Sequence, residues 1–374
     1  MERQRKMPKK ILHIVPALPP DGSAVAEFAC NLAKTQVAAG NEVVIAASAG
    51  ENLAVAAFEA EEMGVRIGRF RPSGGIRHFS REMLVNLRKV VRGADTVHVH
   101  GARSFPVWFG CFCALAEKKR LVVSPHGGFN PEIMAHLPLA DRLLRPIDLL
   151  FMKKADVIHA ASSLEEKWIV AQPGLKGCAG RIVITPPGVE LPRLMPRAQE
   201  HDSRTLLFFG DFERISGLDI LLDALAQCDA HRNCRLILCG ADTGGVRRAL
   251  DEQIERLGLG RKVAFREPVS GMAKWRLFRE ADCFVFPTRG DSFGTAVAEA
   301  LACGLPVICT QAGPWQCLPE AQCGWWCETS AEGLAVAIRD MLYHYNEELA
   351  EMGERGRKFA EEHFSWSATA GALS

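Results

Sequence analysis

Short apolar segments alternate with segments of helical period along the whole chain, and this alternation starts again in the second half. In the first half it predicts strands at residues 11–15, 42–47, 95–99, 121–124 and 156–160. In the second half it predicts strands at residues 205–209, 235–239, 262–265, 283–286 and 307–309. Alternating strands and helices are typical of parallel sheets that helices cover on both faces. We therefore expect an α/β protein with two doubly wound parallel-sheet domains and a cleft between them.

A proline-rich segment separates the two halves. Residues 186–203 contain four prolines together with several charges, which is typical of a linker. The length of 374 residues also favours two domains, at about 150 residues for each. We therefore expect a first domain over residues 1–190 and a second domain over residues 203–351.

Charge balance and cysteine usage exclude several classes of protein. With 45 Lys and Arg against 44 Asp and Glu, the net charge is +1, which argues against nucleic-acid binding because such domains are clearly basic. No run reaches the roughly 18 apolar residues of a membrane-spanning helix, and the start lacks the apolar core of a secretory signal. Thirteen cysteines scattered through apolar segments indicate reduced thiols in a cytoplasmic protein. Cys317, Cys323 and Cys327 lack a second zinc-type pair, so we expect no metal site.

The segment 284–310, FVFPTRGDSFGTAVAEALACGLPVICT, carries the clearest chemical signal. It predicts a buried strand, a loop and then a helix that begins at Gly294. Glu299 lies on this otherwise apolar helix, and an unpaired buried carboxylate is costly, so it needs a dedicated partner. A ribose diol is one such partner, and a structural arginine or a backbone amide is the other. Gly294 and the free N–H groups at the helix start would suit a phosphate.

Two common nucleotide-binding motifs are missing from the sequence. It contains neither G-x-G-x-x-G nor G-x-x-x-x-G-K-[ST]. These motifs place glycine-rich backbone against phosphates in nicotinamide dehydrogenases and P-loop enzymes. The sequence therefore argues against both of these classes.

The same segment resembles the donor-site signature of the retaining family 4 glycosyltransferases of the GT-B fold. In that family a Pro-Ser-x-x-Glu-Gly-Phe-Gly run leads into a helix with a second Glu, followed by Gly-x-Pro-Val. Here residues 287–294 are PTRGDSFG, followed by Glu299 and by GLPV at 304–307. Similar family patterns are DTVHVHG (95–101), SPHG (124–127), KADVIHA (154–160), PPGVE (186–190), CGWW (323–326), MGERG (352–356) and FSW (364–366). The last three resemble a bacterial subgroup that builds surface polysaccharides and lipopolysaccharide.

The resemblance implies both an activity and an architecture. The implied activity is metal-independent transfer of a hexosyl-type sugar, with retention of configuration, from a UDP- or GDP-linked nucleotide sugar to a saccharide or lipid-linked acceptor. No further cofactor is implied. The two Rossmann-like domains would bind acceptor and donor respectively, with a C-terminal helix at about 352–374 returning to the first domain. A GT-B protein that binds without turnover, and another GT-B enzyme such as a sugar-nucleotide epimerase, stay open as alternatives.

The resemblance also implies roles for individual residues of the donor site. Glu299 would hold the ribose, and Asp291 would face the sugar as a catalytic residue. The backbone amides of Phe293, Gly294 and Thr295 would meet the sugar or the phosphates of the donor.

In the first domain the resemblance points to two sets of residues. His126 matches the histidine of a His-Gly pair that lies against the donor sugar in this family, and it is the second expected catalytic residue. His100, at the end of a predicted strand, would line the cleft, whereas we expect His98 to belong to the core. The loop with Gly22 and Ser23 follows the first strand, where the family has Gly-Gly near the diphosphate and the acceptor. A plain turn is an equally good interpretation of that loop.

The sequence departs from the family at the diphosphate. Family members carry Gly-Arg-x-x-x-x-Lys-Gly after the first strand of the second domain, whereas residues 210–217 here are GDFERISG. Gly210 matches, but Asp211 and Ser216 replace the two cations that stabilise the leaving group. Arg214 and Arg289 are the available substitutes. This departure keeps the alternative of a protein without turnover open.

Two segments suggest contact with a membrane. The N-terminus carries Arg3, Arg5, Lys6, Lys9 and Lys10, and a polybasic segment is attracted to anionic lipid. A solvated tail is the alternative. Residues 143–154 are apolar with cationic ends, for which we favour a core helix of the first domain over a membrane-surface helix. We therefore expect a cytoplasmic protein, with peripheral contact at the inner face of the cytoplasmic membrane as a further option.

Overall fold

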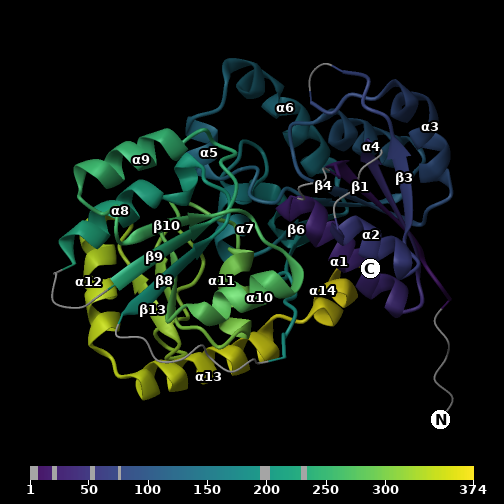
Figure 1. Cartoon of the computed structure of the whole chain (residues 1–374). Coiled ribbons are helices and arrows are strands. Elements are labelled where there is room, and N and C mark those ends of the chain that lie inside the picture. The colour runs from purple at the N-terminus through teal and green to yellow at the C-terminus, as the bar shows by residue number, and fades with distance from the viewer. Residues whose placement is uncertain (1–6, 19–22, 51–54, 75–76, 194–202, 229–233) are drawn as a thin grey trace, which may run out of the picture. The chain divides into compact units, whose positions relative to one another are not determined.

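The computed structural model describes residues 7–18, 23–50, 55–74, 77–193, 203–228 and 234–374. The chain forms two compact units, each built on one parallel sheet (Figure 1). One unit comprises Met1–Gly188 and Trp366–Ser374, and the other comprises Val189–Ser365. Gly22, Arg3, Arg5 and Lys6 lie outside the described residues.

The first unit contains a seven-stranded sheet in the order β3-β2-β1-β4-β5-β6-β7. Its strands are β1 (Lys10–Ala17), β2 (Glu42–Ser48), β3 (Arg66–Phe70), β4 (Thr96–His100), β5 (Arg120–Ser124), β6 (Val157–Ala160) and β7 (Ile182–Ile184). All of the neighbouring strands pair in parallel. The strand order reverses between β1 and β4, which is where ligands bind in doubly wound sheets.

Alternate side chains of β1 point into two different cores. Leu12 and Ile14 belong to a core with helices α3 (Arg81–Arg92), α4 (Phe105–Ala116) and α6 (Leu139–Lys154). Ile11 and Val15 point to the other face, against α1 (Ala24–Ala38) and α2 (Val55–Glu62). Helices therefore cover both faces of the sheet, and β1 is apolar on both sides except for Lys10 at its start and His13. This unit also contains the shorter helical segments α5 (Pro131–Ala135), α7 (Ser163–Val170) and η1 (Lys176–Arg181).

The second unit contains a six-stranded parallel sheet in the order β10-β9-β8-β11-β12-β13. Its strands are β8 (Arg204–Phe209), β9 (Cys234–Cys239), β10 (Val263–Arg266), β11 (Cys283–Phe286), β12 (Val307–Thr310) and β13 (Gly324–Cys327). Its helices are η2 (Arg214–Ser216), α8 (Leu218–Gln227), α9 (Arg247–Arg256), α10 (Gly271–Glu280), α11 (Thr295–Ala302), α12 (Ala331–Tyr343) and α13 (Asn346–His363). The order reverses between β8 and β11. The apolar face of α8 that the leucine spacing predicts is buried.

The end of the chain differs from the expected single returning helix. Helix α13 belongs to the second unit, where Gly353 fits against the backbone of Gly304 so closely that a Cβ would lie 2.1 Å from its carbonyl oxygen. Only α14 (Trp366–Leu373) packs on the first unit, with its Trp366 ring 5.5 Å from that of Phe28. The expectation that residues 352–374 return as one element was therefore wrong for the part before Trp366.

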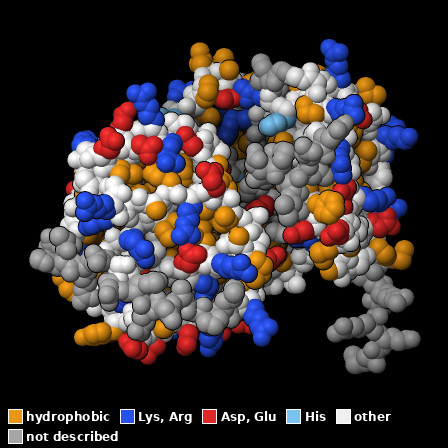
Figure 2. All heavy atoms as spheres, in the orientation of Figure 1, with side chains coloured by type: hydrophobic (Ala, Val, Ile, Leu, Met, Phe, Trp, Pro, Cys, Tyr) orange, Lys and Arg blue, Asp and Glu red, His pale blue; other side chains and the backbone are white. Residues whose placement is uncertain are grey.

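The structure also bears on the segments with membrane-like composition. Residues 143–154 form most of α6, whose Asp148, Leu149 and Met152 are buried, while Leu143 and Leu150 are exposed. In the part of the chain that the structure describes, no helix is both long and apolar enough to cross a bilayer. Acidic and basic side chains are interspersed over the face shown in Figure 2, in keeping with the net charge of +1.

Candidate functional site

The loops after β8 and β11 meet at the carboxyl edge of the second sheet, where the strand order reverses. Gly217 has a φ of +68°, and a Cβ there would lie 2.1 Å from the carbonyl oxygen of Pro287. The amide of Arg289 donates to the carbonyl of Ile215 at 2.7 Å. The glycine at 217 lets the two loops touch, so the residues predicted from 210–217 and 287–294 form one surface.

The loop after β8 is fastened by Ser216. Its hydroxyl donates to the carbonyl of Asp211 at 2.7 Å and accepts from the amide of Glu213 at 3.4 Å. Gly210 has a φ of +149°, and its amide donates to the carbonyl of Cys239 at 3.0 Å. Ser216 therefore shapes the loop at the position where the resemblance expects a lysine, and it brings no charge to it.

Arg289 and Arg214 are held very differently. Arg289 forms two hydrogen bonds with the carboxylate of Asp219, at 2.6 and 2.7 Å, and a third with the carbonyl of Arg214 at 3.0 Å. Burial works to raise the pKa of Asp219, but the bonds and charge of Arg289 lower it overall. Among the described residues the exposed guanidinium of Arg214 has no hydrogen-bond or ion-pair partner. Arg214 is therefore the substitute cation with charge available for a ligand, whereas Asp219 neutralises Arg289.

Asp291 caps its own loop. One carboxylate oxygen accepts from the amides of Phe293, at 2.8 Å, and Gly294, at 2.6 Å. Burial raises the pKa of Asp291. The ring of Phe293 is buried against the rings of Trp315 and Phe364, with centroids 5.3 and 5.4 Å away. Two of the three amides predicted to meet the ligand therefore donate to Asp291 in this structure.

The third predicted amide belongs to Thr295, the first residue of α11. Within the described part of the chain it has no hydrogen-bond acceptor, as is usual for the first turn of a helix. Gly294 caps this helix with a φ of +80°. A donor group of the backbone thus remains open at the start of α11, where the helix dipole favours negative charge.

Glu299 has the dedicated partner that its apolar surroundings require. Lys274 of α10 donates to one of its carboxylate oxygens at 2.7 Å, and the two side chains are only 13% and 16% exposed. The ammonium also lies 4.5 Å from the centre of the Trp275 ring. A lysine on another helix is thus a partner of Glu299, a pairing that the sequence did not predict. Sequence patterns gave no sign of Lys274, which is one cation on an amphipathic helix.

Five histidines gather near the carboxyl edge of the first sheet. They come from β1, β4, β6 and the loop after β5, and they are His13, His98, His100, His126 and His159. His13 pairs with His98 across β1 and β4, so both point to the face covered by α1. The ring of Phe28 on α1 lies against those of His126, His159 and His100. His98 is core, as expected, but His100 is also fully buried, so the expectation that His100 lines the cleft was wrong. His126 and Phe28 cover it.

His126 occupies a constrained position. Its φ is +49°, a left-handed conformation that is uncommon for residues other than glycine. The next amide, that of Gly127, donates to the buried carboxylate of Glu165 at 2.5 Å, and the second oxygen of that carboxylate accepts from Ala161 at 2.8 Å. Burial lowers the pKa of His126 to about 3, so the ring is neutral at pH 7. Glu165, which sequence reasoning missed, thus anchors the loop that places His126.

Three of these histidines are close enough to hold an ion. Within the described part of the chain, the ring nitrogens of His13, His98 and His100 lie within 4.8 Å of one another. Each of the three rings is fully buried.

At the start of α1, Ser23 accepts a hydrogen bond from the amide of Ala26 at 3.2 Å, which gives it a structural role as helix cap.

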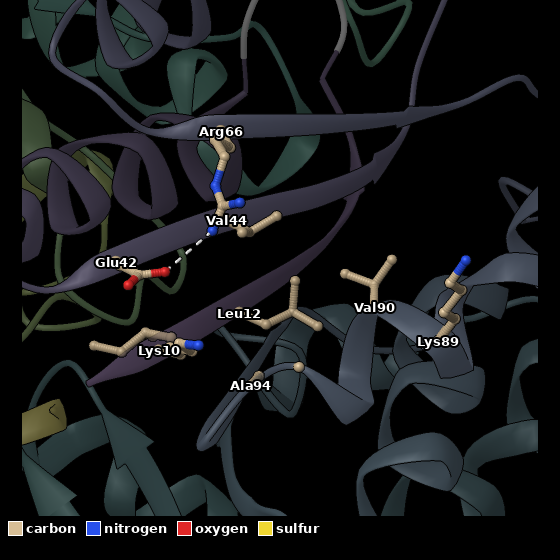
Figure 3. Close-up of a pocket in the computed structure, with 10 residues that line it drawn as sticks. Lys10, Leu12, Glu42, Val44, Arg66, Lys89, Val90 and Ala94 are labelled. Carbon is tan, nitrogen blue, oxygen red and sulfur yellow. Dashed lines mark hydrogen bonds and ion pairs between the residues drawn. The ribbon is translucent and has the colours of Figure 1, made fainter. Parts of the chain in front are cut away.

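A cavity of about 440 Å³ lies at the opposite, amino edge of the first sheet (Figure 3). The first residues of three strands, Lys10, Glu42 and Arg66, line it together with Lys89 of α3. Glu42 and Arg66 form an ion pair across it at 3.5 Å. Because doubly wound sheets bind ligands at the carboxyl edge, we do not assign the site to this cavity.

Comparisons with known proteins give glycosyltransferases for both halves of the chain. Residues 25–193 match the model of Glycosyltransferase Family 4, and residues 195–359 match that of Glycosyl transferases group 1. D-inositol 3-phosphate glycosyltransferase of Corynebacterium jeikeium is 31% identical over 242 residues, which are 59% of this chain and 56% of the relative. D-inositol 3-phosphate glycosyltransferase 2 of Catenulispora acidiphila is 31% identical over 268 residues, 66% of this chain and 60% of the relative. The chain thus spans less than two thirds of these relatives' length.

Solved structures share the fold over almost the whole chain. Sucrose-phosphate synthase from Thermosynechococcus elongatus has a TM-score of 0.75 and 21% identity, covering 97% of this chain and 96% of that one. Anabaena Alr3699/HepE in complex with UDP and glucose has a TM-score of 0.76 and 18% identity, covering 97% of both chains. WaaG, a glycosyltransferase involved in lipopolysaccharide biosynthesis, has a TM-score of 0.71 and 17% identity, covering 98% and 99%. The likeness shows the GT-B fold with its two doubly wound parallel-sheet domains.

Proposed function

We propose that this chain, which carries a family 4 glycosyltransferase domain followed by a group 1 glycosyltransferase domain, transfers a sugar from a nucleotide-sugar donor to a hydroxyl acceptor. The observation that carries the proposal is the surface formed by the loops after β8 and β11. There the residues that match the donor signature come together at the edge of the sheet where ligands bind.

Each residue of this surface then has a role. Glu299, oriented by Lys274, accepts hydrogen bonds from the ribose hydroxyls of a UDP- or GDP-linked donor. Arg214 and the amide of Thr295 stabilise the charge of the diphosphate as it leaves. Asp291 faces the sugar and keeps its loop closed through its own backbone bonds.

We propose transfer with retention of configuration. The acceptor oxygen attacks C1 of the sugar from the side on which the diphosphate departs. As the bond between C1 and the diphosphate oxygen breaks, the acceptor proton passes to that oxygen, and the new glycosidic bond forms. The names of the sequence relatives suggest an inositol phosphate as acceptor, whereas the likeness to WaaG suggests a lipopolysaccharide saccharide.

Binding without turnover is the second candidate function. Asp211 and Ser216 stand where family members carry cations, and Asp219 neutralises Arg289. Of the two cations in these loops, Arg214 is then the one left to stabilise the leaving diphosphate.

A thermal-shift panel of UDP, GDP and ADP sugars tests the proposed function. A nucleotide sugar at a hundred times its Kd will stabilise the protein by about 2.7 kcal/mol, and Glu299→Ala will abolish most of this shift. Glu252→Ala, an exposed carboxylate on α9 of the same unit, is the matched control and will keep the shift. If no nucleotide sugar stabilises the wild type, the donor site is wrong. A sugar that binds but is neither hydrolysed nor transferred to saccharide, lipid-linked or inositol phosphate acceptors supports binding without turnover.

A further inference from the structure

A chain of hydrogen bonds runs through the core of the first unit from α1 to His126. Gln36 Oε1 lies 2.7 Å from His13 Nε2, and His13 Nδ1 lies 2.9 Å from His100 Nε2. His100 Nδ1 then lies 3.0 Å from His126 Nε2. Gln36, His13 and His100 are fully buried, so no water replaces these links.

Gln36 sets the direction of this chain. Its Nε2 donates to the hydroxyl of Ser374 at 3.3 Å, and that hydroxyl donates to the carbonyl of Ala370 at 2.6 Å. The amide orientation is therefore fixed, with Oε1 toward His13. An amide oxygen can only accept, so His13 Nε2 carries the hydrogen of this link.

The hydrogen of every later link follows from the first. A neutral imidazole carries one N–H, so His13 Nδ1 is bare and accepts from His100 Nε2. His100 Nδ1 is then bare and accepts from His126 Nε2, which leaves His126 Nδ1 bare as well. Burial lowers the pKa of His13 to about 4 and that of His100 far below its usual range, which supports neutral rings. His126 Nδ1 has no partner among the described residues, and His126 is partly exposed.

We propose that Gln36, His13 and His100 are positioning residues that lock His126 in its Nε2–H tautomer and thereby present a bare Nδ1 lone pair at the carboxyl edge of the first sheet. Such a nitrogen accepts a hydrogen bond from a hydroxyl and repels groups that can only accept, such as phosphate and carboxylate. His126 therefore selects a sugar hydroxyl over an anionic group. This selection, though not the tautomer, rests on the proposed function.

A second chain of bonds lies beside the first and provides a control. Thr185 accepts from His159 Nε2 at 2.9 Å, and His159 Nδ1 is linked through the hydroxyl of Ser124 to His98 Nε2. It ends at His98 Nδ1, which is buried without a partner in the described structure. His98 shares the strand, the face and the burial of His100 but has no link to His126.

A metal ion at His13, His98 and His100 is the rival interpretation of the cluster. An ion there would take the lone pair of His13 Nδ1 and displace the hydrogen shared with His100. It would also bury two positive charges among neutral rings, which is costly without an anionic ligand. We therefore favour the hydrogen-bond chain, and a titration with zinc distinguishes the two interpretations.

The experiment is ¹⁵N NMR of imidazole tautomers in the whole 374-residue chain. We expect Nε2–H tautomers for His13, His100 and His126 in the wild type. His100→Phe will convert His126 to a mixture of tautomers, whereas His98→Phe will leave it unchanged. Gln36→Leu, which removes the acceptor and keeps the three rings, will convert His126 to a mixture of tautomers, so the proposal does not depend on His100→Phe folding well.

Three results would overturn the proposal. They are an Nδ1–H tautomer of His126 in the wild type, an equal effect of the His98 and His100 variants, and stoichiometric zinc binding that shifts the His13, His98 and His100 signals. A binding measurement then tests the proposed function separately from the tautomer. We expect His100→Phe to weaken the binding of a nucleotide sugar about tenfold, which is the size of one lost hydrogen bond. The affinity for the free nucleoside diphosphate will stay unchanged. If neither ligand binds the wild type while the tautomers are as expected, the proposed function fails and the locked tautomer stands.

Discussion

Lowering the pH from about 7 to about 5.5 will remove about 5 to 6 kcal/mol from the free energy of unfolding of the first unit. Four fully buried histidines cause most of this loss: His13, His98, His100 and His159. Burial lowers the pKa of His13 and of His159 to about 4, and it lowers those of His98 and His100 well below the usual value. The folded state is therefore fully stable, with respect to these four rings, above their unfolded pKa of about 6.5. This part of the free energy of unfolding is lost as the pH falls from there toward the lower pKa values of the folded state. At one unit below the unfolded pKa, each ring costs about 1.4 kcal/mol.

Urea unfolding and potentiometric proton uptake measure this effect. Because domains are stable by only about 5–15 kcal/mol, this loss is roughly a third or more of the stability of the first unit. About four protons will be taken up on unfolding at that pH. His98→Phe will take up one proton fewer and will show a shallower dependence on pH. An unfolding free energy that is unchanged between these pH values would show that the rings are not held neutral.

Arg214→Ala will lower kcat/KM for the nucleotide sugar about 100-fold, while Arg289→Ala will act mainly on stability. Loss of one group that stabilises developing charge costs about 10²–10³ in rate, and the exposure of Arg214 places it at the lower end. The guanidinium of Arg289 is already paired with the carboxylate of Asp219, and it also donates a hydrogen bond to the carbonyl of Arg214. Steady-state kinetics with the donor found in the thermal-shift panel will measure the difference.

The control for this pair is Arg248→Ala, which removes an exposed arginine from α9 of the same unit. It will leave kcat/KM unchanged. The contradicting result is the reverse one, in which Arg289→Ala lowers kcat/KM about 100-fold and Arg214→Ala stays near the wild type. That result would mean that Arg289 leaves Asp219 when the donor binds. The assignment of the diphosphate cation would in that case be reversed.

Strands that are apolar on both faces were predicted from the sequence, whereas three of the four edge strands were not. Buried runs such as β1 and β11 were expected close to their observed bounds. β3, β7 and β13 were missed, and each lies at or next to the end of its sheet. β3 carries exposed arginines, and the apolar run of β7 is only three residues long, so neither stands out in the sequence. Short edge strands need little hydrophobic pattern because they pair with a strand on one side only.

The residues of the candidate site could be named from the sequence, but their pairings could not. The need of Glu299 for a partner follows from its apolar helix, yet Lys274 lies 25 residues away on another helix. Arg289 and Asp219 are 70 residues apart, and only the meeting of the β8 and β11 loops brings them together. Likewise, His13 and His100 meet because β1 and β4 are neighbours, which strand order decides and local sequence does not.

Hydrogen–deuterium exchange with and without the donor tests the central claim most directly. We expect a nucleotide sugar to slow exchange in peptides that cover residues 210–217 and 287–299, because both loops and the start of α11 then contact the diphosphate and the ribose. Peptides around the cavity at Lys10, Glu42 and Arg66 will exchange as in the free protein. Protection confined to that cavity, or none in the two loops at saturating donor, would contradict a donor site at the carboxyl edge of the second sheet.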